Sequence, residues 1–381
     1  MMSQKNKKPA LRLDGMSSFL SSVMAIAVGL LFGFVILLIS NPQQAINGLM
    51  VIVKGGFNGG AKGVGQMLYH ATPLILTGLS VGFAFKTGLF NIGASGQLIT
   101  GALAAIWVGV NWTWLPAPWH WIAAILAAMI VGGLWASVPG LFKAFLGVNE
   151  VISCIMMNYI GMYGVNYLIK ISNVYDKLKN QTANVAKSAV LPYGGLDKVF
   201  FEKIGKLVRP SSVNIGIYIA IIAAIVIYVL LNKTTFGYEL KACGHNREAS
   251  RYAGINEKRS ILLSMIIAGM LSGLAGAVMY LAKSDGLHID VVEVLSPQGF
   301  NGIPVALLGL SNPLGIIFSG IFIAHLEQGG YYLQKLNYMP EIIDIIIGAI
   351  IYFSAFSLLF KNVIASAAKG FSKNKNKEAG K

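Results

Sequence analysis

Charge is scarce in this sequence, and long stretches carry none. Only 12% of the 381 residues are charged, 55% are hydrophobic, and the mean hydropathy is +0.65. No Asp, Glu, Lys or Arg lies between Asp14 and Lys54. Soluble domains carry about 25% charged residues, so this composition excludes an ordinary soluble protein. The sequence predicts a chain that is embedded in a membrane.

Cysteine is also scarce, and sequence signals of chemistry are missing. Cys154 lies in an apolar run and Cys243 in a polar loop, so they form neither a disulfide framework nor a metal-ligand spacing. The sequence has no Gly-x4-Gly-Lys-Ser/Thr loop for ATP phosphates, no His/Cys cluster, and no nucleophile–base pair that residue order can establish. We therefore expect no metal, no cofactor and no catalysis on a solute.

Apolar runs recur at the length that a membrane helix requires. A hydrocarbon core of about 30 Å needs about 20 apolar residues per helix, and only helices or closed barrels satisfy the backbone there. These runs are too long for barrel strands, so the predicted fold is all-α and polytopic. The expected spans are 16–40, 64–85, 88–110, 120–142, 151–169, 213–231, 261–282, a broken stretch from about 300 to 328, and 341–360.

The net charge of +15 comes mostly from loops and tails. Anionic headgroups of membrane lipid explain this pattern better than nucleic acid, because the basic residues form no face with interleaved aromatics. The basic tails, residues 1–15 and 361–381, favour a cytoplasmic location for both ends of a transmembrane domain covering residues 16–360.

An even number of crossings follows from this orientation. The 300–328 stretch must then cross twice as two short helices, split at Ser311-Asn312-Pro313, which gives about ten spans. The same count places the polar segment 170–212 outside the cell and the segment 232–260 in the cytoplasm.

Two glycine-broken polar sequences interrupt the apolar runs. The first break, Phe90–Gln97, reads FNIGASGQ, and the second break, Gln298–Pro304, reads QGFNGIP. Unwound backbone at membrane depth lines a cavity or is buried in protein, and paired breaks mark substrate paths in repeat-built transporters. The alternative is that the glycines only allow close helix packing. The candidate pathway residues are Asn91, Ser95, Gln97 and Asn301, together with Asn158 from the run that follows Asn149.

Several ionisable residues lie near predicted helix ends. Glu150 follows Asn149 at the start of an apolar helix, where the helix dipole favours a carboxylate. We favour capping for Glu150 over a proton relay, and we treat His325, Glu327 and Asp344 similarly because helix ends are easily solvated.

The polar loop Thr235–Ile255 contains a short predicted helix between Gly244 and Gly254. A solvated connector is the default interpretation, but small residues let another surface approach closely, and glycines can redirect the chain. This pattern favours docking onto a cytoplasmic partner protein. The candidate docking residues are Gly237, Ala242, Gly244, Asn246, Ala249, Ala253 and Gly254.

Four motifs in order, Phe90–Gln97, Asn149–Ser153, Gly244–Ile255 and Gly299–Gly309, resemble permease subunits of bacterial ABC importers. The resemblance covers about residues 60–360. It is to the branch shared by ribose, branched-chain amino acid and nucleoside systems, and within it to nucleoside or simple-sugar permeases.

The resemblance implies a type II-like importer core of about ten spans in the bacterial cytoplasmic membrane. It also implies a second permease subunit, two cytoplasmic ABC ATPase subunits and an extracellular solute-binding protein as partners. The 237–255 loop is similar to the coupling helix that fits a groove on the ATPase. The segment 170–212 is longer than a minimal connection and is a candidate contact for the binding protein.

Two other functions remain open from the sequence. An ion-coupled secondary transporter or channel explains the broken helices, but it leaves the 237–255 loop without a role and requires deep ionisable groups. A structural membrane scaffold predicts no dependence on solute. The sequence does not decide between nucleosides, sugars and amino acids, because amides can bond to hydroxyls and base edges alike.

Overall fold

The computed structural model describes residues 10–205, 207–282, 288–339 and 341–355. The chain divides into two compact units. The larger unit comprises residues 55–328, and the smaller unit comprises residues 1–54 and 329–381.

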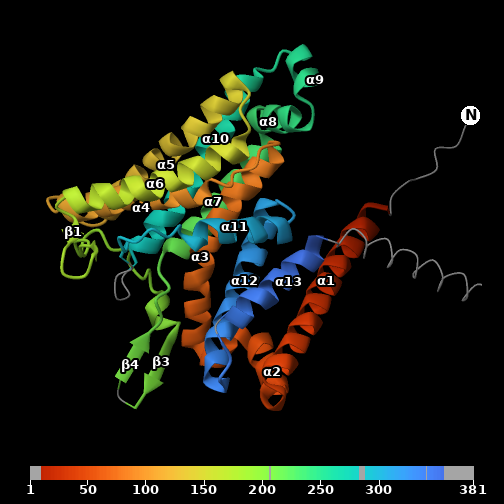
Figure 1. Cartoon of the computed structure of the whole chain (residues 1–381), viewed down its shortest axis with the longest axis vertical. Coiled ribbons are helices and arrows are strands. Elements are labelled where there is room, and N and C mark those ends of the chain that lie inside the picture. The colour runs from red at the N-terminus through yellow and green to blue at the C-terminus, as the bar shows by residue number, and fades with distance from the viewer. Residues whose placement is uncertain (1–9, 206, 283–287, 340, 356–381) are drawn as a thin grey trace, which may run out of the picture. The chain divides into compact units, whose positions relative to one another are not determined.

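Helices make up most of the larger unit (Figure 1). It begins with a short 3-10 turn, Gly55–Gly59. The long helices are α3 (Gly60–Lys86), α4 (Ala94–Asn111), α5 (Trp119–Leu146), α6 (Glu150–Ile171), α7 (Gly216–Lys233), α10 (Glu257–Tyr280) and α12 (Pro313–Leu333), whose last turn belongs to the smaller unit. The shorter helices are α8 (Thr235–His245), α9 (Arg247–Tyr252) and α11 (Pro297–Leu308).

Helix α10 is central in this unit and packs against α3, α4 and α5. Glycines allow its backbone to approach that of α5. A Cβ atom added at Gly132 would lie 2.5 Å from the carbonyl oxygen of Gly269, and one added at Gly273 would overlap the carbonyl oxygen of Ala128. Without a hydrophobic force between helices in lipid, such close backbone packing is a main source of association. These glycines of α5 and α10, which lie outside the two predicted breaks, therefore allow close helix packing.

Six stretches of the described chain are long and apolar enough to cross a membrane, and a bent helix pair raises this to seven. They are Pro42–Lys86, which contains α3, then α4, α5, α6, α7 and α10, with the α11–α12 pair as the seventh. The chain is thus a polytopic helical protein. Of the expected terminal spans, Ile26–Ser40 is counted only as a shorter apolar helix, and residues 356–360 lie outside the described residues.

The break at Ser311-Asn312-Pro313 is confirmed. Helices α11 and α12 are bent by 120° at this point. Leu310 and Ser311 both adopt left-handed backbone, with φ values of 55° and 51°. At about 1.5 Å per residue, the 12 residues of α11 span only about 18 Å. Helix α11 alone is therefore shorter than the hydrocarbon core of about 30 Å.

The segment 170–212 contains four short strands, which the all-α prediction omitted. Strands β1 (Tyr175–Asp176) and β2 (Gln181–Thr182) form one antiparallel hairpin, and β3 (Phe201–Ile204) and β4 (Leu207–Pro210) form another. A short 3-10 turn, Leu196–Lys198, precedes β3. Strands of two to four residues give no run long enough to show a two-residue period, so the sequence does not indicate them.

These hairpins are attached to the rest of the larger unit. The Thr182 N–H donates to the Ile289 carbonyl at 3.0 Å, and the Ile289 N–H donates to the Thr182 hydroxyl at 3.1 Å. Lys62 of α3 pairs with Glu202 of β3 at 3.1 Å. The segment is therefore an ordered part of this unit.

The smaller unit is also helical. It contains α1 (Ala10–Ser40), α2 (Ala45–Lys54) and α13 (Glu341–Ala355), with short 3-10 turns at Pro42–Gln44 and Gln334–Leu336. Helix α1 packs along α13. A Cβ atom at Gly29 would lie 2.6 Å from the Ile350 Cα, so the two backbones touch there. The Tyr338 hydroxyl donates to the Asn41 carbonyl at 2.9 Å. This bond joins the segment before α13 to the residue that follows α1.

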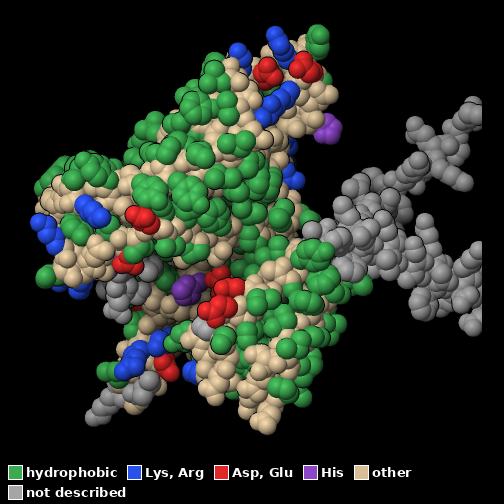
Figure 2. All heavy atoms as spheres, viewed as in Figure 1, with side chains coloured by type: hydrophobic (Ala, Val, Ile, Leu, Met, Phe, Trp, Pro, Cys, Tyr) green, Lys and Arg blue, Asp and Glu red, His purple; other side chains and the backbone are tan. Residues whose placement is uncertain are grey.

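The outer face of α5 and α6 is hydrophobic, whereas charged side chains gather at its two ends (Figure 2). One charged end lies over α8 and α9, and the other lies near β1. Only 33% of the most apolar stretch of α5 is buried, although its mean hydropathy is 2.1. Exposed apolar residues such as Ile130 and Leu134 form this face. A hydrophobic band between two charged ends is the surface that a membrane-spanning body requires.

Candidate functional site

The first break closes around a pair of side-chain amides. The Asn91 Nδ2 donates to the Gln97 Oε1, and the Gln97 Nε2 donates to the Asn91 Oδ1, both at 2.8 Å. Asn91 lies in the non-helical linker between α3 and α4, and Gln97 lies in the first turn of α4. Both side chains are at most 1% exposed. The reciprocal bonds satisfy two amides that would otherwise be expensive at this depth.

Two serines extend this amide pair onto neighbouring helices. The Asn91 Nδ2 also donates to the Ser80 Oγ of α3 at 3.0 Å, and the Ser272 Oγ of α10 donates to the same atom at 2.8 Å. Ser80 in turn donates to the Ala268 carbonyl at 2.6 Å. We call Ser80, Asn91, Gln97 and Ser272 the polar cluster. It ties the first break to α3, α4 and α10.

Asn158 holds the first break from the side of α6. Its Oδ1 accepts the Gly96 N–H at 2.8 Å, and its Nδ2 donates to the Ile92 carbonyl at 3.0 Å. A Cβ atom at Gly96 would lie 2.9 Å from the Asn158 Cα, so only glycine permits this approach. Asn158 therefore satisfies backbone groups that the interrupted helix leaves unpaired.

The two breaks predicted from the sequence lie against each other. The Ser95 Oγ donates to the Ser296 carbonyl, just before α11, at 2.8 Å. A Cβ atom at Gly299 would lie 2.5 Å from the Ser95 nitrogen. The N-terminal turn of α11 thus touches the N-terminal turn of α4 through backbone atoms. Segments about 200 residues apart in sequence meet at one place.

Asn301 lies apart from this cluster and lines a cavity of about 160 Å³. The cavity lies among α3, α10, α11 and α12, and its polar lining comes from Tyr69, His70, Gln298, Asn301 and Glu327. Of the five predicted pathway residues, four are buried and bonded to protein groups, and Asn301 is the one that lines this cavity. Tyr69 and His70 were missed because both lie in the predicted 64–85 span outside either break, whereas Gln298 belonged to the second break.

Helices α8 and α9 form an exposed hairpin at one charged end of the larger unit (Figures 1 and 2). We call residues 235–254, which comprise α8, α9 and the two residues that follow α9, the docking element. The Thr234 side chain accepts the Gly237 N–H and starts α8, and the Asn246 side chain accepts the Ala249 N–H and starts α9, both at 3.0 Å. These are ordinary N-caps. The predicted short helix between Gly244 and Gly254 is confirmed as α9.

The predicted docking residues divide into two groups. Asn246, Ala249, Ala253 and Gly254 are exposed, while Ala242 is half-buried. Gly237 and Gly244 instead face the protein: a Cβ atom at Gly237 would overlap the Leu230 carbonyl of α7, and one at Gly244 would lie 2.5 Å from the Thr87 carbonyl carbon. These two glycines do not belong to an outward surface, because their missing side chains let α8 pack closely on its neighbours.

Glu150 and Asn149 behave as helix-end residues. The Asn149 side chain accepts the Val151 N–H at 2.9 Å and caps α6. Glu150 pairs with Lys143 of α5 at 2.7 Å. Elsewhere, the Gly56 N–H donates to the His325 ring at 3.3 Å, and Asp344 is exposed on α13. The interpretation of Glu150 as a capping-region residue fits this geometry.

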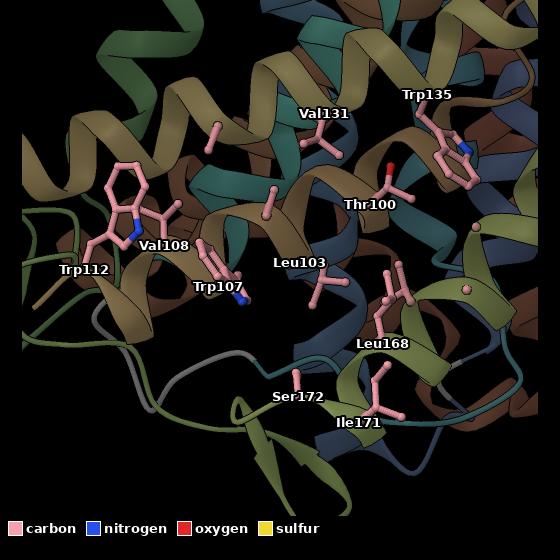
Figure 3. Close-up of a pocket in the computed structure, with 15 residues that line it drawn as sticks. Thr100, Leu103, Trp107, Val108, Trp112, Val131, Trp135, Leu168, Ile171 and Ser172 are labelled. Carbon is pink, nitrogen blue, oxygen red and sulfur yellow. The ribbon is translucent and has the colours of Figure 1, made fainter.

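A larger groove of about 680 Å³ lies among α4, α5 and α6 (Figure 3). Leu103 and Trp107 of α4 and Leu168 of α6 line it, and its walls are almost entirely apolar. The Thr100 hydroxyl is occupied by a bond to the Gly96 carbonyl at 2.8 Å. Ligand sites of this size normally add a few polar groups that orient the ligand. This apolar groove suits hydrocarbon chains rather than a polar solute.

Residues 63–355 match the family described as the permease component of the branched-chain amino acid transport system. The guanosine ABC transporter permease protein NupP of Bacillus subtilis strain 168 is 38% identical over 355 residues, which are 93% of this chain and 98% of the relative. The nucleoside ABC transporter permease protein NupB of Lactococcus lactis subsp. cremoris strain MG1363 is 33% identical, over 91% and 93%.

The glucose ABC transporter permease protein TsgB13 of Haloferax volcanii is 32% identical over 78% of this chain and 77% of the relative. No solved structure matches the chain. The family match covers most of the sequence, including both breaks, α8 and α9. The chain therefore belongs to the branched-chain amino acid transport system permease family, as a multi-pass membrane permease subunit of an ABC transporter.

Proposed function

We propose that this permease imports nucleosides with energy from ATP hydrolysis in separate subunits. The observation that carries the proposal is the near full-length similarity to a permease named for guanosine and to another named for nucleosides. The chain itself has no phosphate-binding loop of the Gly-x4-Gly-Lys-Ser/Thr type. Its partners are cytoplasmic ABC ATPase subunits, a second permease subunit and an extracellular solute-binding protein.

In this proposal the docking element lies in the cytoplasm and contacts an ATPase. The exposed surface of Asn246, Ala249, Ala253 and Gly254 offers small side chains, which another protein can approach closely. Both termini are cytoplasmic, and the core is type II-like with about ten spans. The β1–β2 hairpin of segment 170–212 lies at the opposite end of the apolar face (Figure 1), and in this proposal the segment meets the binding protein outside the cell.

The solute passes beside the two breaks and through the cavity that Asn301 lines. Nucleosides carry an aromatic base, amide-like edges and ribose hydroxyls. The cavity supplies matching groups: the Tyr69 ring for stacking, the amides of Gln298 and Asn301 for base edges, and the Glu327 carboxylate for hydroxyls. At about 160 Å³ it is smaller than the roughly 300 Å³ of usual ligand pockets, so it must widen during transport.

The proposed mechanism is alternating access, in which the solute path opens to one side of the membrane at a time. The hydrogen bonds that hold the first break are the contacts that change. ATP-driven closure of the ATPases moves the docking element, and the polar cluster rearranges so that the breaks face one side of the membrane or the other. ATP can drive this change only if the ATPases bind the two conformations differently. Asn91, Ser95, Gln97 and Asn158 then act by positioning the break, and Asn301 contacts the solute.

Uptake by the reconstituted complex tests the proposed function. Proteoliposomes that contain both permeases, the ATPases and the binding protein should accumulate labelled guanosine only when ATP is supplied on the ATPase side. Unlabelled nucleosides should compete, whereas glucose and leucine should not. Accumulation driven by an ion gradient without ATP, or by this subunit alone, would instead establish a secondary transporter or channel.

The Gly254→Trp variant tests the docking element. Gly254 has a φ of +82° and no heavy atom within 4 Å of an added Cβ atom, so an indole would project from the exposed surface. We expect ATPase co-purification and uptake to fall about tenfold or more, because a bulky group at a tightly packed contact removes well over 1.4 kcal/mol of binding.

Gly195→Trp is the matched control for this variant. Gly195 also has a positive φ, +85°, and open space around it, but it lies in the 170–212 segment. It carries the same backbone strain without touching the docking element. Equal ATPase co-purification for the two variants would refute the docking assignment.

A further inference from the structure

The end of α8 touches the linker that leads into the first break. A Cβ atom at Gly88 would lie 2.5 Å from the Gly244 Cα, and one at Gly244 would lie 2.6 Å from the Gly88 nitrogen. No side chain lies between the two segments, so their backbones are in direct contact. Gly88 also has a φ of +73°, which favours glycine. We call this the glycine contact.

The linker is held tightly on the other side of the glycine contact. The Thr87 hydroxyl is hydrogen bonded to the Ser264 hydroxyl of α10, and both side chains are buried. Leu89 is 2% exposed and packs in a core cluster that includes Met265 and Ala268 of α10. Because Thr87 and Leu89 are both held against α10, a movement of Gly88 is not absorbed by a flexible neighbour.

Only two residues, Leu89 and Phe90, separate Gly88 from Asn91 of the polar cluster. At the other end of α8, Gly237 packs directly on the Leu230 carbonyl of α7. The helix is thus braced against α7 at its start and against the linker at its end, and α9 projects outward. Close-packed backbones transmit a displacement because they cannot be compressed.

We propose that the glycine contact is the point at which movement of the docking element reaches the solute path. Gly88 and Gly244 act as positioning residues: pressure on α9 moves the end of α8, which shifts Gly88 and changes the hydrogen bonds of the Asn91–Gln97 pair. This inference rests on the proposed function, and it identifies one contact rather than a diffuse change of the whole helical body as the link.

Gly88→Ala is the direct test, with Gly147→Ala as its matched control. Both residues have similar positive φ values, +73° and +69°, so alanine strains both backbones alike. Only Gly88 has a backbone neighbour in the way, because nothing lies within 4 Å of a Cβ atom at Gly147. The measurements are ATPase co-purification, ATP hydrolysis and guanosine uptake in proteoliposomes.

We expect Gly88→Ala to keep ATPase co-purification and basal ATP hydrolysis, but to lower guanosine uptake per ATP hydrolysed about tenfold. Gly147→Ala should match the parent protein in all three measurements. A merely structural role would lower assembly and uptake together and leave their ratio unchanged. An unchanged uptake per ATP in Gly88→Ala would overturn the inference.

Ser264→Ala is a second, gentler variant for the case in which Gly88→Ala does not assemble. The Thr87 hydroxyl keeps bonds to the Phe83 and Ala84 carbonyls, so no buried group is left without a partner. We expect about threefold lower uptake per ATP, with normal assembly. A normal ratio here would count against the glycine contact. If the parent complex itself shows no ATP-dependent uptake, the proposed function fails instead.

Discussion

We expect Gly299→Val to lose nucleoside uptake almost completely. A Cβ atom at this position would lie 2.5 Å from the Ser95 nitrogen, so valine would push α11 away from the first break. The obstructing atoms are backbone, and no side-chain rotation can remove the overlap. Overpacking with an extra side chain destabilises a fold by about 1–3 kcal/mol. Because the overlap here is with backbone, we expect a loss of folding stability of about 3 kcal/mol or more. The Ser95–Ser296 hydrogen bond should break as well.

The measurements are ATP-dependent uptake and the melting temperature of the purified complex. Gly164→Val is the control, because Gly164 is a helical glycine of α6 with no heavy atom within 4 Å of an added Cβ atom. It lines the apolar groove, where a valine side chain has space. Gly299→Val should lower both quantities and Gly164→Val neither. If Gly299→Val transports normally, direct contact between the two breaks is not required.

A second large effect is expected from Asn91→Leu. Leucine cannot bond to Gln97, so the two polar atoms of that buried amide lose their partners. Each orphaned atom costs about 1–3 kcal/mol, which gives about 2–6 kcal/mol in total. Ser80 keeps its bonds to Ala268 and Ser272 and adds nothing to this loss. We expect a lower melting temperature and loss of uptake.

The double variant Asn91→Leu, Gln97→Leu separates stability from transport. Removing both amides leaves no orphaned group at the pair, and such paired replacements are nearly neutral for stability. The melting temperature should therefore recover most of its loss. Uptake should stay low, because the rearranging bonds are gone. Recovery of both quantities would show that the amide pair is only structural.

The position of the site could be predicted from the sequence because polar residues and glycines stand out against apolar helices. The two breaks were visible as FNIGASGQ and QGFNGIP, and they lie in contact. Their partners were not visible. Ser80 and Ser272 are single small polar residues inside long apolar helices, where a serine often bonds to its own backbone. Only the packing of α3 and α10 identifies them.

The docking element shows a similar limit. Its glycines and alanines marked a special loop, and α9 begins and ends as the glycine spacing predicted. The same residue type serves two opposite purposes there, since Gly254 is exposed whereas Gly244 allows a backbone contact with the linker between α3 and α4. Composition cannot distinguish these environments. The strands of segment 170–212 were missed because each is too short to show a repeating pattern.

The polar cluster has a consequence for leakage of ions through the permease. Its four side chains are hydrogen bonded to one another and are at most 1% exposed, so water does not reach them at this point. Protons and small ions cross a membrane most readily along continuous chains of water. A buried, self-bonded polar cluster interrupts such a chain, so a cell can keep many copies of this permease without dissipating its ion gradients.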